Sequence, residues 1–189
     1  TTLRRAVVWL VVGGAVAFQV TSCGGKLPDL PALSTVSKNT PESARESRQQ
    51  VPSVATMFRE CPQFFAAGKS PIVPQAPLLH ELCYDSFAIL HSGESKTPVF
   101  VAQRMNQESV ADADEKRTDK FFADARLPRA ERAELADYKG SGYSRGHMAP
   151  AGDMPNPTAM AQSFSLANMV PQNSKQNSGP WAKIEKDTR

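Results

Sequence analysis

Apolar residues in this chain occur in short runs that prolines and glycines interrupt, and this pattern is the strongest constraint on its fold. The 189 residues include 15 Pro and 11 Gly. Few segments keep a helical period for long, whereas residues 81–90 and 98–104 are rich in strand-forming residues. The polar residues 92–95 separate these two runs, so a hairpin is predicted. Short strands with few long helices predict an α+β fold.

The first residues have the layout of an export segment. Arg4 and Arg5 precede an apolar run over residues 6–20, and small residues follow up to Cys23. Val20-Thr21-Ser22-Cys23 is similar to the lipobox of bacterial lipoproteins. A cleaved secretory signal and a retained membrane anchor are the two alternatives. All three predict an exported protein: a periplasmic or outer-membrane-tethered lipoprotein, a secreted protein, or one anchored in the inner membrane.

Composition divides the remainder into a tether and a domain. Residues 24–58 are rich in Pro, Ser, Thr and Gln and predict a flexible tether, which leaves residues 59–189 for the folded domain. The whole chain carries 22 basic and 19 acidic residues. Residues 1–58 hold six of the basic and three of the acidic ones, so the domain carries 16 of each. This balance excludes a charge-driven coat on nucleic acid, and any nucleic-acid contact must be local.

Cysteine and histidine usage narrows the chemistry further. If Cys23 is lipidated, Cys61 and Cys83 remain as a pair that can form a disulfide in an oxidising compartment. His80 and His91 flank a predicted strand without partners at metal-ligand spacing, and are interpreted as structural. His147 differs, because it lies in a glycine-containing loop two residues after Arg145.

The segments around His147 and Asn177 are similar to a known family. Ser144-Arg145-Gly146-His147 is followed by Asn168-Met169-Val170-Pro171-Gln172, by Asn177 nine residues after Asn168, and by Glu185 eight residues later. This chain resembles the DNA/RNA non-specific endonucleases of the ββα-metal class. The resemblance covers roughly residues 61–189. It implies a central antiparallel sheet flanked by helices, with a ββα-metal catalytic element.

The resemblance also implies the site residues. His147 corresponds to the general base that activates water, Asn177 to the single protein ligand of Mg²⁺ (or Mn²⁺), and Glu185 to a carboxylate that holds the waters of the metal ion. Arg145 and Asn168 correspond to residues flanking the phosphate. Arg117 corresponds to an upstream arginine that faces the phosphate, with Arg104 and Arg126 as competitors.

Two features depart from the family pattern. Ser144 stands where the family has Asp. Any orienting role of that carboxylate must therefore be performed by the serine hydroxyl or by another group. The family also continues with further strand and helix beyond the metal-binding helix, so we expect this chain to be short at its C-terminus.

The residue types fit phosphodiester hydrolysis independently of the family. A neutral imidazole can take a proton from water at neutral pH, and one amide oxygen leaves the charge of a magnesium ion available to the phosphate. Taken locally, Asn177 before Ser-Gly-Pro is also a candidate N-cap of a helix opening near Ser178. The expected activity is cleavage of DNA and RNA through phosphate contacts. The alternative is a non-catalytic envelope lipoprotein that binds nucleic acid.

Overall fold

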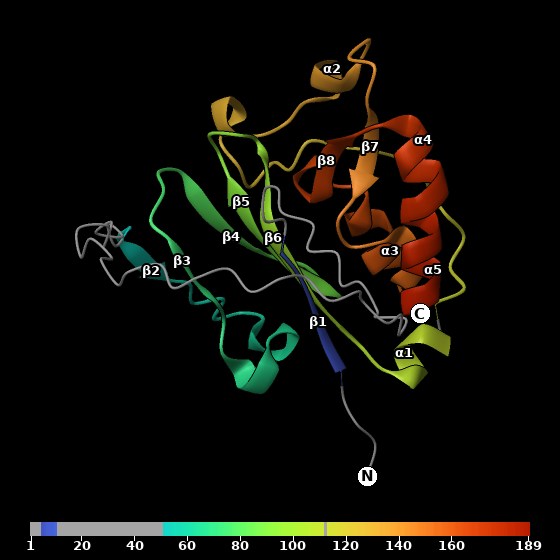
Figure 1. The fold of residues 1–189 in the computed structure, drawn as a ribbon, viewed down its shortest axis with the longest axis horizontal. Helices are drawn as coiled ribbons and strands as arrows, with labels where there is room; N and C mark the ends of the chain where they lie inside the picture. The colour runs from blue at the N-terminus through green and yellow to red at the C-terminus, as the bar shows by residue number, and fades with distance from the viewer. Residues whose placement is uncertain (1–4, 11–50, 112) are drawn as a thin grey trace, which may run out of the picture. The chain divides into compact units, whose positions relative to one another are not determined.

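An antiparallel sheet of four strands, in the order β1-β6-β5-β4, forms the centre of the fold (Figure 1). The computed structural model describes residues 5–10, 51–111 and 113–189. The sheet strands are β1 (Arg5–Leu10), β4 (Leu79–Cys83), β5 (Phe87–Ser92) and β6 (Thr97–Met105). Two small two-stranded sheets pair β2 (Ser53–Ala55) with β3 (Ile72–Pro74), and β7 (Ser144–His147) with β8 (Met169–Gln172).

Short helical segments connect and cover the strands. The α-helices are α1 (Gln107–Ala111), α2 (Leu135–Tyr138), α3 (Pro157–Ser163), α4 (Ser174–Gln176) and α5 (Ala182–Thr188). The 3₁₀ turns are η1 (Pro62–Phe64), η2 (Ala66–Gly68), η3 (Arg129–Glu131), η4 (Ala151–Asp153) and η5 (Leu166–Asn168), and η6 (Asn177–Trp181) is a π-helical turn. No described helix is long and apolar enough to cross a membrane.

The predicted hairpin of residues 81–90 with 98–104 is confirmed in part. Strands β5 and β6 pair antiparallel, with Leu90 opposite Phe100. The run over 81–90 is not one strand, however, because the chain reverses between β4 and β5. The amide of Tyr84 donates to the carbonyl of Phe87 (2.9 Å), with Asp85 and Ser86 at the turn. Asp and Ser favour turns because their side chains bond nearby backbone groups.

Two helical segments begin at sequence signals. The turn η3 begins directly after Pro128. Helix α3 starts at Pro157 with Asn156 as its N-cap and is followed by the separate turn η5. The Asn156 side chain accepts the amide of Ala159 at 2.8 Å, which fixes the start of α3.

Alternation along β5 and β6 separates two hydrophobic cores, one on each face of the sheet. Phe87 and Ile89 of β5 face one core, which the segment from Met148 to Ala167 covers. Ala88 and Leu90 face the other, which is covered by residues between Phe58 and Val73. The first core supports the elements that carry His147, so the sheet is the platform for the candidate site.

The N-terminal boundaries differ from the predicted ones. Residues 11–50, with Cys23 and most of the predicted tether, lie outside the described residues, as do residues 1–4. Arg5–Leu10, predicted to begin an export segment, is strand β1 and pairs antiparallel with β6. The fold also begins before residue 59: β2 pairs with β3, and Phe58, 1% exposed, is part of the second core.

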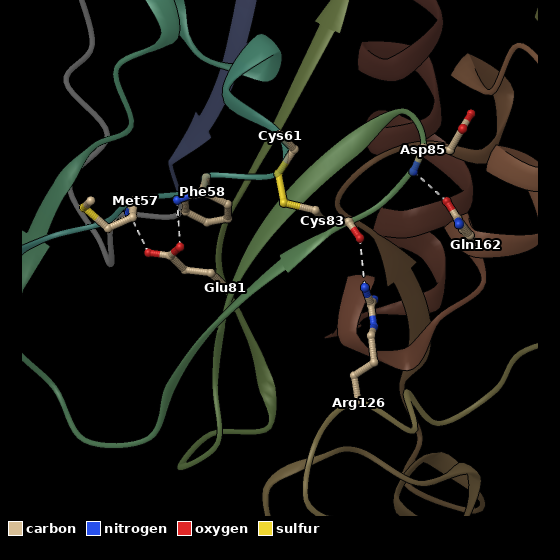
Figure 2. The surroundings of a disulfide bond; sticks show 8 residues. All are labelled: Met57, Phe58, Cys61, Glu81, Cys83, Asp85, Arg126 and Gln162. Carbon is tan, nitrogen blue, oxygen red and sulfur yellow. Dashed lines mark hydrogen bonds between the residues drawn. A yellow bond between two sulfur atoms is a disulfide. The ribbon is translucent and has the colours of Figure 1, made fainter.

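The predicted pairing of Cys61 with Cys83 is present as a disulfide (Figure 2). It ties the segment that covers the second core to the end of β4. Glu81 reinforces this connection, since its carboxylate accepts the amides of Met57 and Phe58 at 2.6 and 2.7 Å. On the other side, Arg126 donates to the carbonyl of Cys83 at 2.8 Å. The disulfide therefore joins two parts of the fold outside the candidate site.

Replacing both Cys61 and Cys83 with serine should lower the free energy of unfolding by about 3 kcal/mol, because the bond closes a loop with a sequence separation of 22. Thermal melts of the oxidised, reduced and double-serine proteins measure the change. The expected metal requirement should not change. Two free thiols detected by mass spectrometry in the exported protein would contradict the pairing.

Candidate active site

His147 ends strand β7, which pairs antiparallel with β8 so that His147 lies opposite Met169. The prediction of a loop position is wrong: the chain is extended here and leaves little freedom to the imidazole. Gly146 is needed for the close approach of β8, since a Cβ at this position would lie 2.9 Å from the Cβ of Gln172. Its small size thus serves the hairpin rather than contact with a ligand.

Two aromatic rings enclose the imidazole of His147. The ring centroids of Phe121 and Phe164 lie 5.9 and 5.0 Å away, and Phe164 meets the imidazole edge-on. The side chain is only 7% exposed. Nε2 is enclosed without a hydrogen-bond partner among the described residues. Since Nδ1 is not enclosed in this way, it is the ring nitrogen available to solvent.

Two guanidinium groups lie on the same aromatic rings. Arg145 stacks on Phe121, with its Cζ 3.9 Å from the ring centroid, and Arg117 lies over Phe164 at 4.9 Å. Arg117 also pairs with Asp119 (2.6 Å), an exposed ion pair. Both arginines therefore lie beside His147 and form a cationic border around it.

The competing arginines are placed elsewhere. Arg126 binds Asp124 with two nitrogens, at 3.0 and 2.7 Å. Burial alone would raise the pKa of Asp124, but hydrogen bonds from Arg126 and Tyr84 outweigh it and lower this pKa to about 2. Arg104 is exposed on β6, away from the residues that line the cleft described below. The structure thus favours Arg117 for the upstream position.

Burial, together with the positive charges of Arg117 and Arg145, lowers the pKa of His147 to about 3, although Asp119 acts in the opposite direction. An imidazole with this pKa is neutral at physiological pH. The free nitrogen can therefore accept a proton, which is the state a general base requires.

The free energy of unfolding should fall as the pH drops from 7 to 4, by about 3 kcal/mol from His147. The unfolded state binds a proton on this residue near pH 6.5, whereas the folded state binds it only near pH 3. The stabilisation is therefore complete above pH 6.5 and is lost progressively below it. Urea titrations of wild type and His147→Asn at pH 7, 5.5 and 4 isolate this contribution, and parallel pH profiles of the two proteins would disprove it.

A cleft of about 540 Å³ lies beside His147. Its walls are Arg117, Asp119, Phe121, Leu135, Tyr138, Lys139, Tyr143, Ser144, Arg145 and Asn177. Three of these side chains are cationic, which suits a negatively charged ligand. Phe121 connects the cleft with the imidazole, because it borders both.

Asn177 reaches this cleft from the helix that follows β8 (Figure 1). That helix begins at Ser174, with the Asn173 side chain accepting the amides of Lys175 and Gln176. The prediction that the helix opens near Ser178, with Asn177 as its N-cap, is therefore wrong. Asn177 has helical dihedral angles (φ −62°, ψ −48°), and its side chain forms no hydrogen bond with any described residue. The amide is thus free to bind a ligand.

The helix widens into the π-turn η6 directly after α4. Pro180 lies inside this turn, where it cannot donate to the carbonyl four residues earlier and its ring would clash with it. A π-turn spans one residue more than an α-turn. Two residues that are eight positions apart across η6 are therefore separated around the helix axis by about the same angle as residues seven apart in a regular helix. Residues seven apart lie on one face. Asn177 and Glu185 are separated by eight positions across η6.

Glu185 is half-buried on α5 near a second group of charged residues. Burial raises its pKa, a hydrogen bond from Trp181 opposes the shift, and the neighbouring Asp153 adds to it. Asp153 is 5% exposed and forms an ion pair with Arg189 at 2.8 Å. Glu185 does not line the cleft itself, so any action on a ligand there would pass through intervening waters.

Asn168 is fully buried and supports the site from beneath. Its side-chain oxygen accepts the amide of Ala149, and its nitrogen donates to the carbonyls of Ala149 and Ser163, each at 2.9 Å. These bonds engage both polar atoms of the side chain, and the predicted position beside the phosphate stays a prediction. Asn168 is a positioning residue that holds the chain immediately after His147.

Asn168→Asp should lower the free energy of unfolding by about 3–5 kcal/mol, since it places a carboxylate against two buried carbonyl oxygens. Asn173→Ala is the matched control: it removes an exposed N-cap, and we expect a loss of about 1 kcal/mol. Chemical denaturation measures both. Normal stability of Asn168→Asp combined with lost activity would instead assign Asn168 to the chemistry.

Comparison with known proteins identifies the family. Residues 70–189, more than half of the chain, match the family described as DNA/RNA non-specific endonuclease. The chain belongs to this family. The expected fold is confirmed as well: strands β7 and β8 with the following helix form the ββα unit of the endonuclease family, next to an antiparallel sheet.

Individual relatives of the endonuclease family support the match. "Nuclease EXOG, mitochondrial" of Homo sapiens is 41% identical over 105 residues, which cover 54% of this chain and 28% of that protein. "Nuclease 1, mitochondrial" of Schizosaccharomyces pombe is 39% identical over 80 residues, covering 41% and 25%. A crystal structure of the EndoG/EndoGI complex aligns with a TM-score of 0.52 and 30% identity, over 57% of this chain and 46% of that one. This chain thus spans about three tenths of the EXOG relative.

A divalent metal fits the residues present in this endonuclease domain only through Asn177. Among the described residues, no group of three or more His, Cys, Asp or Glu side chains could hold a metal ion. The free amide of Asn177 lines the cleft, and Glu185 follows eight residues later on α5. An amide oxygen with several retained waters is a set of ligands that Mg²⁺ accepts.

Ser144, at the position where the family signature has Asp, contacts the helix that follows β8. Its hydroxyl hydrogen-bonds to that of Ser174 at 2.7 Å. This contact joins the start of β7 to the first residue of the helix that bears Asn177. Ser144 therefore connects the strand and the helix of the ββα unit through a neutral pair.

Several residues at the site were not singled out from the sequence. Phe121 and Phe164 form the aromatic frame of His147, and Tyr138, Lys139 and Tyr143 form a wall of the cleft. The two phenylalanines carry no local signal, because apolar residues in the core look the same in sequence. The segment of residues 138–143 directly before Ser144 does carry a local signal, because it combines two tyrosines and a lysine with two glycines.

Proposed function

We propose that this protein is a metal-dependent endonuclease that hydrolyses the phosphodiester bonds of DNA and RNA without sequence preference. The observation that carries the proposal is the state of His147: a neutral, enclosed imidazole between two guanidinium-bearing aromatic rings, beside the cleft that Asn177 enters. Membership of the DNA/RNA non-specific endonuclease family supports it.

In the proposed reaction His147 removes the proton of the attacking water. We assign the ring proton to the enclosed Nε2, which leaves the lone pair on Nδ1 to accept the proton of the water. Phe121 and Phe164 hold the ring in one orientation. Because the surroundings disfavour the imidazolium, the proton is then readily passed on to solvent or to the leaving oxygen.

Arg145 and Arg117 bind the phosphate in this proposal. Their guanidinium groups lie on opposite rings of the aromatic frame and both line the cleft. Planar guanidinium groups suit phosphate oxygens, and they offset the extra negative charge that forms during hydrolysis. Asn177 would hold a divalent ion with waters near Glu185, and that ion would supply further positive charge to the phosphate and the leaving oxygen.

Lack of sequence preference follows from the nature of these contacts. Contacts to phosphates position a nucleic acid but carry no information about its sequence. The cleft offers three cationic side chains, Arg117, Lys139 and Arg145, for such contacts. The same contacts serve DNA and RNA, because both have the phosphate backbone.

Incubation with supercoiled plasmid and with a structured RNA, each with Mg²⁺ and with excess EDTA, tests the proposal. We expect both substrates to be degraded only with the metal, and His147→Asn to cleave either of them at least about 100-fold more slowly. Binding of both without cleavage under any metal condition would overturn it in favour of the non-catalytic nucleic-acid-binding alternative.

We also propose that the protein is exported. The Cys61–Cys83 disulfide supports this, because such bonds persist mainly in oxidising compartments. Cell fractionation and mass spectrometry of the mature N-terminus test it, and a lipid on Cys23 would identify the lipoprotein alternative. Processing at Cys23 would also remove β1 from its pairing with β6. An unprocessed protein with free thiols in the cytoplasm would refute export.

A further inference from the structure

A second hollow adjoins the cleft and shares two of its side chains. It has a volume of about 330 Å³ and is lined by Ser95, Lys96, Thr97, Ala133, Asp137, Tyr138, Ser141, Tyr143 and Pro171. Tyr138 and Tyr143 line both cavities. The two tyrosines therefore form a ridge between the cleft and this hollow, which we call the side hollow.

The walls of the side hollow suit a flat, partly apolar ring. Tyr143 is 57% exposed, an unusual degree for a large aromatic side chain, and presents a surface for stacking. Ala133 and Pro171 add apolar atoms. Burial raises the pKa of Tyr138 to about 12, so its hydroxyl keeps its proton and can donate a hydrogen bond. A nucleobase has a ring face for stacking and edge acceptors for such a donor.

One free positive charge borders the side hollow. Lys96 is half-buried and forms no ion pair with any described residue. The hollow also contains Asp137, whose carboxylate accepts the amide of Glu134 at 2.9 Å in the cap of α2. Lys96 is therefore the group available to a phosphate next to a bound base.

The rim of the side hollow is rigidly built from two distant segments. The turn between β5 and β6 carries Lys96, and Figure 1 draws it at the same end of the fold as α2. Glu131 joins the two: its backbone carbonyl contacts Nε2 of His91 at 2.9 Å, and its carboxylate contacts Nε2 of His80 at 2.5 Å. Gly93 permits this packing, since a Cβ there would lie 2.8 Å from the Cβ of Glu131. The cavity is thus preformed.

We propose that the side hollow binds one unpaired nucleobase of the strand whose phosphate occupies the cleft, with Tyr143 stacking on the base and Lys96 contacting the neighbouring phosphate. The inference rests on the proposed function, because the cleft must hold the strand for the next nucleotide to reach the hollow. A base inside a duplex has both faces covered, so only a single-stranded or locally opened segment fits. The site favours such segments without reading sequence.

Binding of a fluorescein-labelled deoxyadenylate 10-mer, measured by anisotropy over a range of salt concentrations, tests the assignment. All variants carry His147→Asn to prevent cleavage. Tyr143→Ala should weaken binding by about 5- to 150-fold and leave the salt dependence unchanged, since it removes stacking and no charge. Tyr143→Phe should bind within twofold of the parent. Lys96→Gln should reduce the slope of log affinity against log salt by about 0.7, the value for one phosphate contact on a single strand.

Lys69→Gln is the matched control, because Lys69 is an exposed lysine next to η2 that lines neither cavity. We expect it to behave like the parent. The assignment is overturned if Tyr143→Ala and Lys96→Gln bind like Lys69→Gln, even where wild type cleaves the 10-mer. If the predicted pattern of binding is found but wild type cleaves no substrate, the side hollow stands and the proposed nuclease function fails.

Discussion

Replacing His147 with asparagine should lower the rate of phosphodiester cleavage by about 10²- to 10⁴-fold, the usual contribution of a general base. The side chain packs between Phe121 and Phe164, so its removal also affects the fold. Asparagine keeps a planar polar group there, whereas alanine would leave a void. Initial rates on a fluorogenic oligonucleotide, with melting curves of the same samples, separate lost chemistry from lost structure.

The dependence of kcat/KM on pH provides the control for this interpretation. In the proposed mechanism activity requires neutral His147, so it should be lost as the pH falls through the pKa of this residue in the folded protein, which burial and two neighbouring arginines lower to about 3. We therefore expect no decline due to His147 between pH 7 and 5, where an ordinary imidazole would be half protonated near pH 6.5. A folded His147→Asn protein with wild-type rates would remove His147 from the mechanism.

Replacing Asn177 with alanine should nearly abolish metal-dependent cleavage. The amide forms no hydrogen bond with any described residue and lines the cleft, so its loss removes a ligand without disturbing the helix. Calorimetric titration with Mn²⁺ and Mg²⁺ should show weaker binding, while the melting temperature without metal stays within a few degrees. Unchanged metal affinity would show that the ligand lies elsewhere, with Glu185 and Asp153 as the next candidates.

Two further variants define how Asn177 acts. Asn177→Asp retains an oxygen ligand but adds a charge, so we expect metal binding at least as tight as in wild type and slower turnover, because less positive charge remains for the phosphate. Glu185→Gln should lose less activity than Asn177→Ala, since Glu185 does not line the cleft and glutamine still hydrogen-bonds to water. A larger loss in Glu185→Gln would reverse the two roles.

The sequence alone was sufficient to predict those features of the fold and site that depend on local residue patterns or on a characteristic spacing. Alternation and polar turn residues predicted the pairing of β5 with β6, and the scarcity of cysteines left Cys61 and Cys83 as a pair. The spacing of His147 and Asn177 predicted two residues that lie near one cleft on successive elements of a ββα unit. These features can be predicted because they depend on hydrogen bonding and spacing between residues that are close in the chain.

The tertiary structure decided which polar side chains face the cleft. Asn168 and Arg126 are residue types that bind phosphate, yet both are held by other partners. Asn168 bonds to Ala149, 19 positions away, and Arg126 bonds to Asp124 and to the carbonyl of Cys83, 43 positions away. Arg117 reaches the site because Phe164, 47 positions further along the chain, supports its guanidinium group. Composition cannot distinguish these cases, since the partner that satisfies a polar group depends on the packing of the whole domain.

The helix after β8 also combines a feature determined by the sequence with one decided by the tertiary structure. Asn177 and Glu185 are eight residues apart in the sequence, which in a regular helix places them on neighbouring faces, about 80° apart. Pro180 prevents the regular hydrogen bond and the chain widens into η6, so the additional residue is absorbed and the angle between the two positions becomes smaller. The types and the order of the candidate site residues could be predicted from the sequence. Their relative orientation, and the aromatic frame that keeps His147 neutral, result from long-range packing that only the folded chain provides.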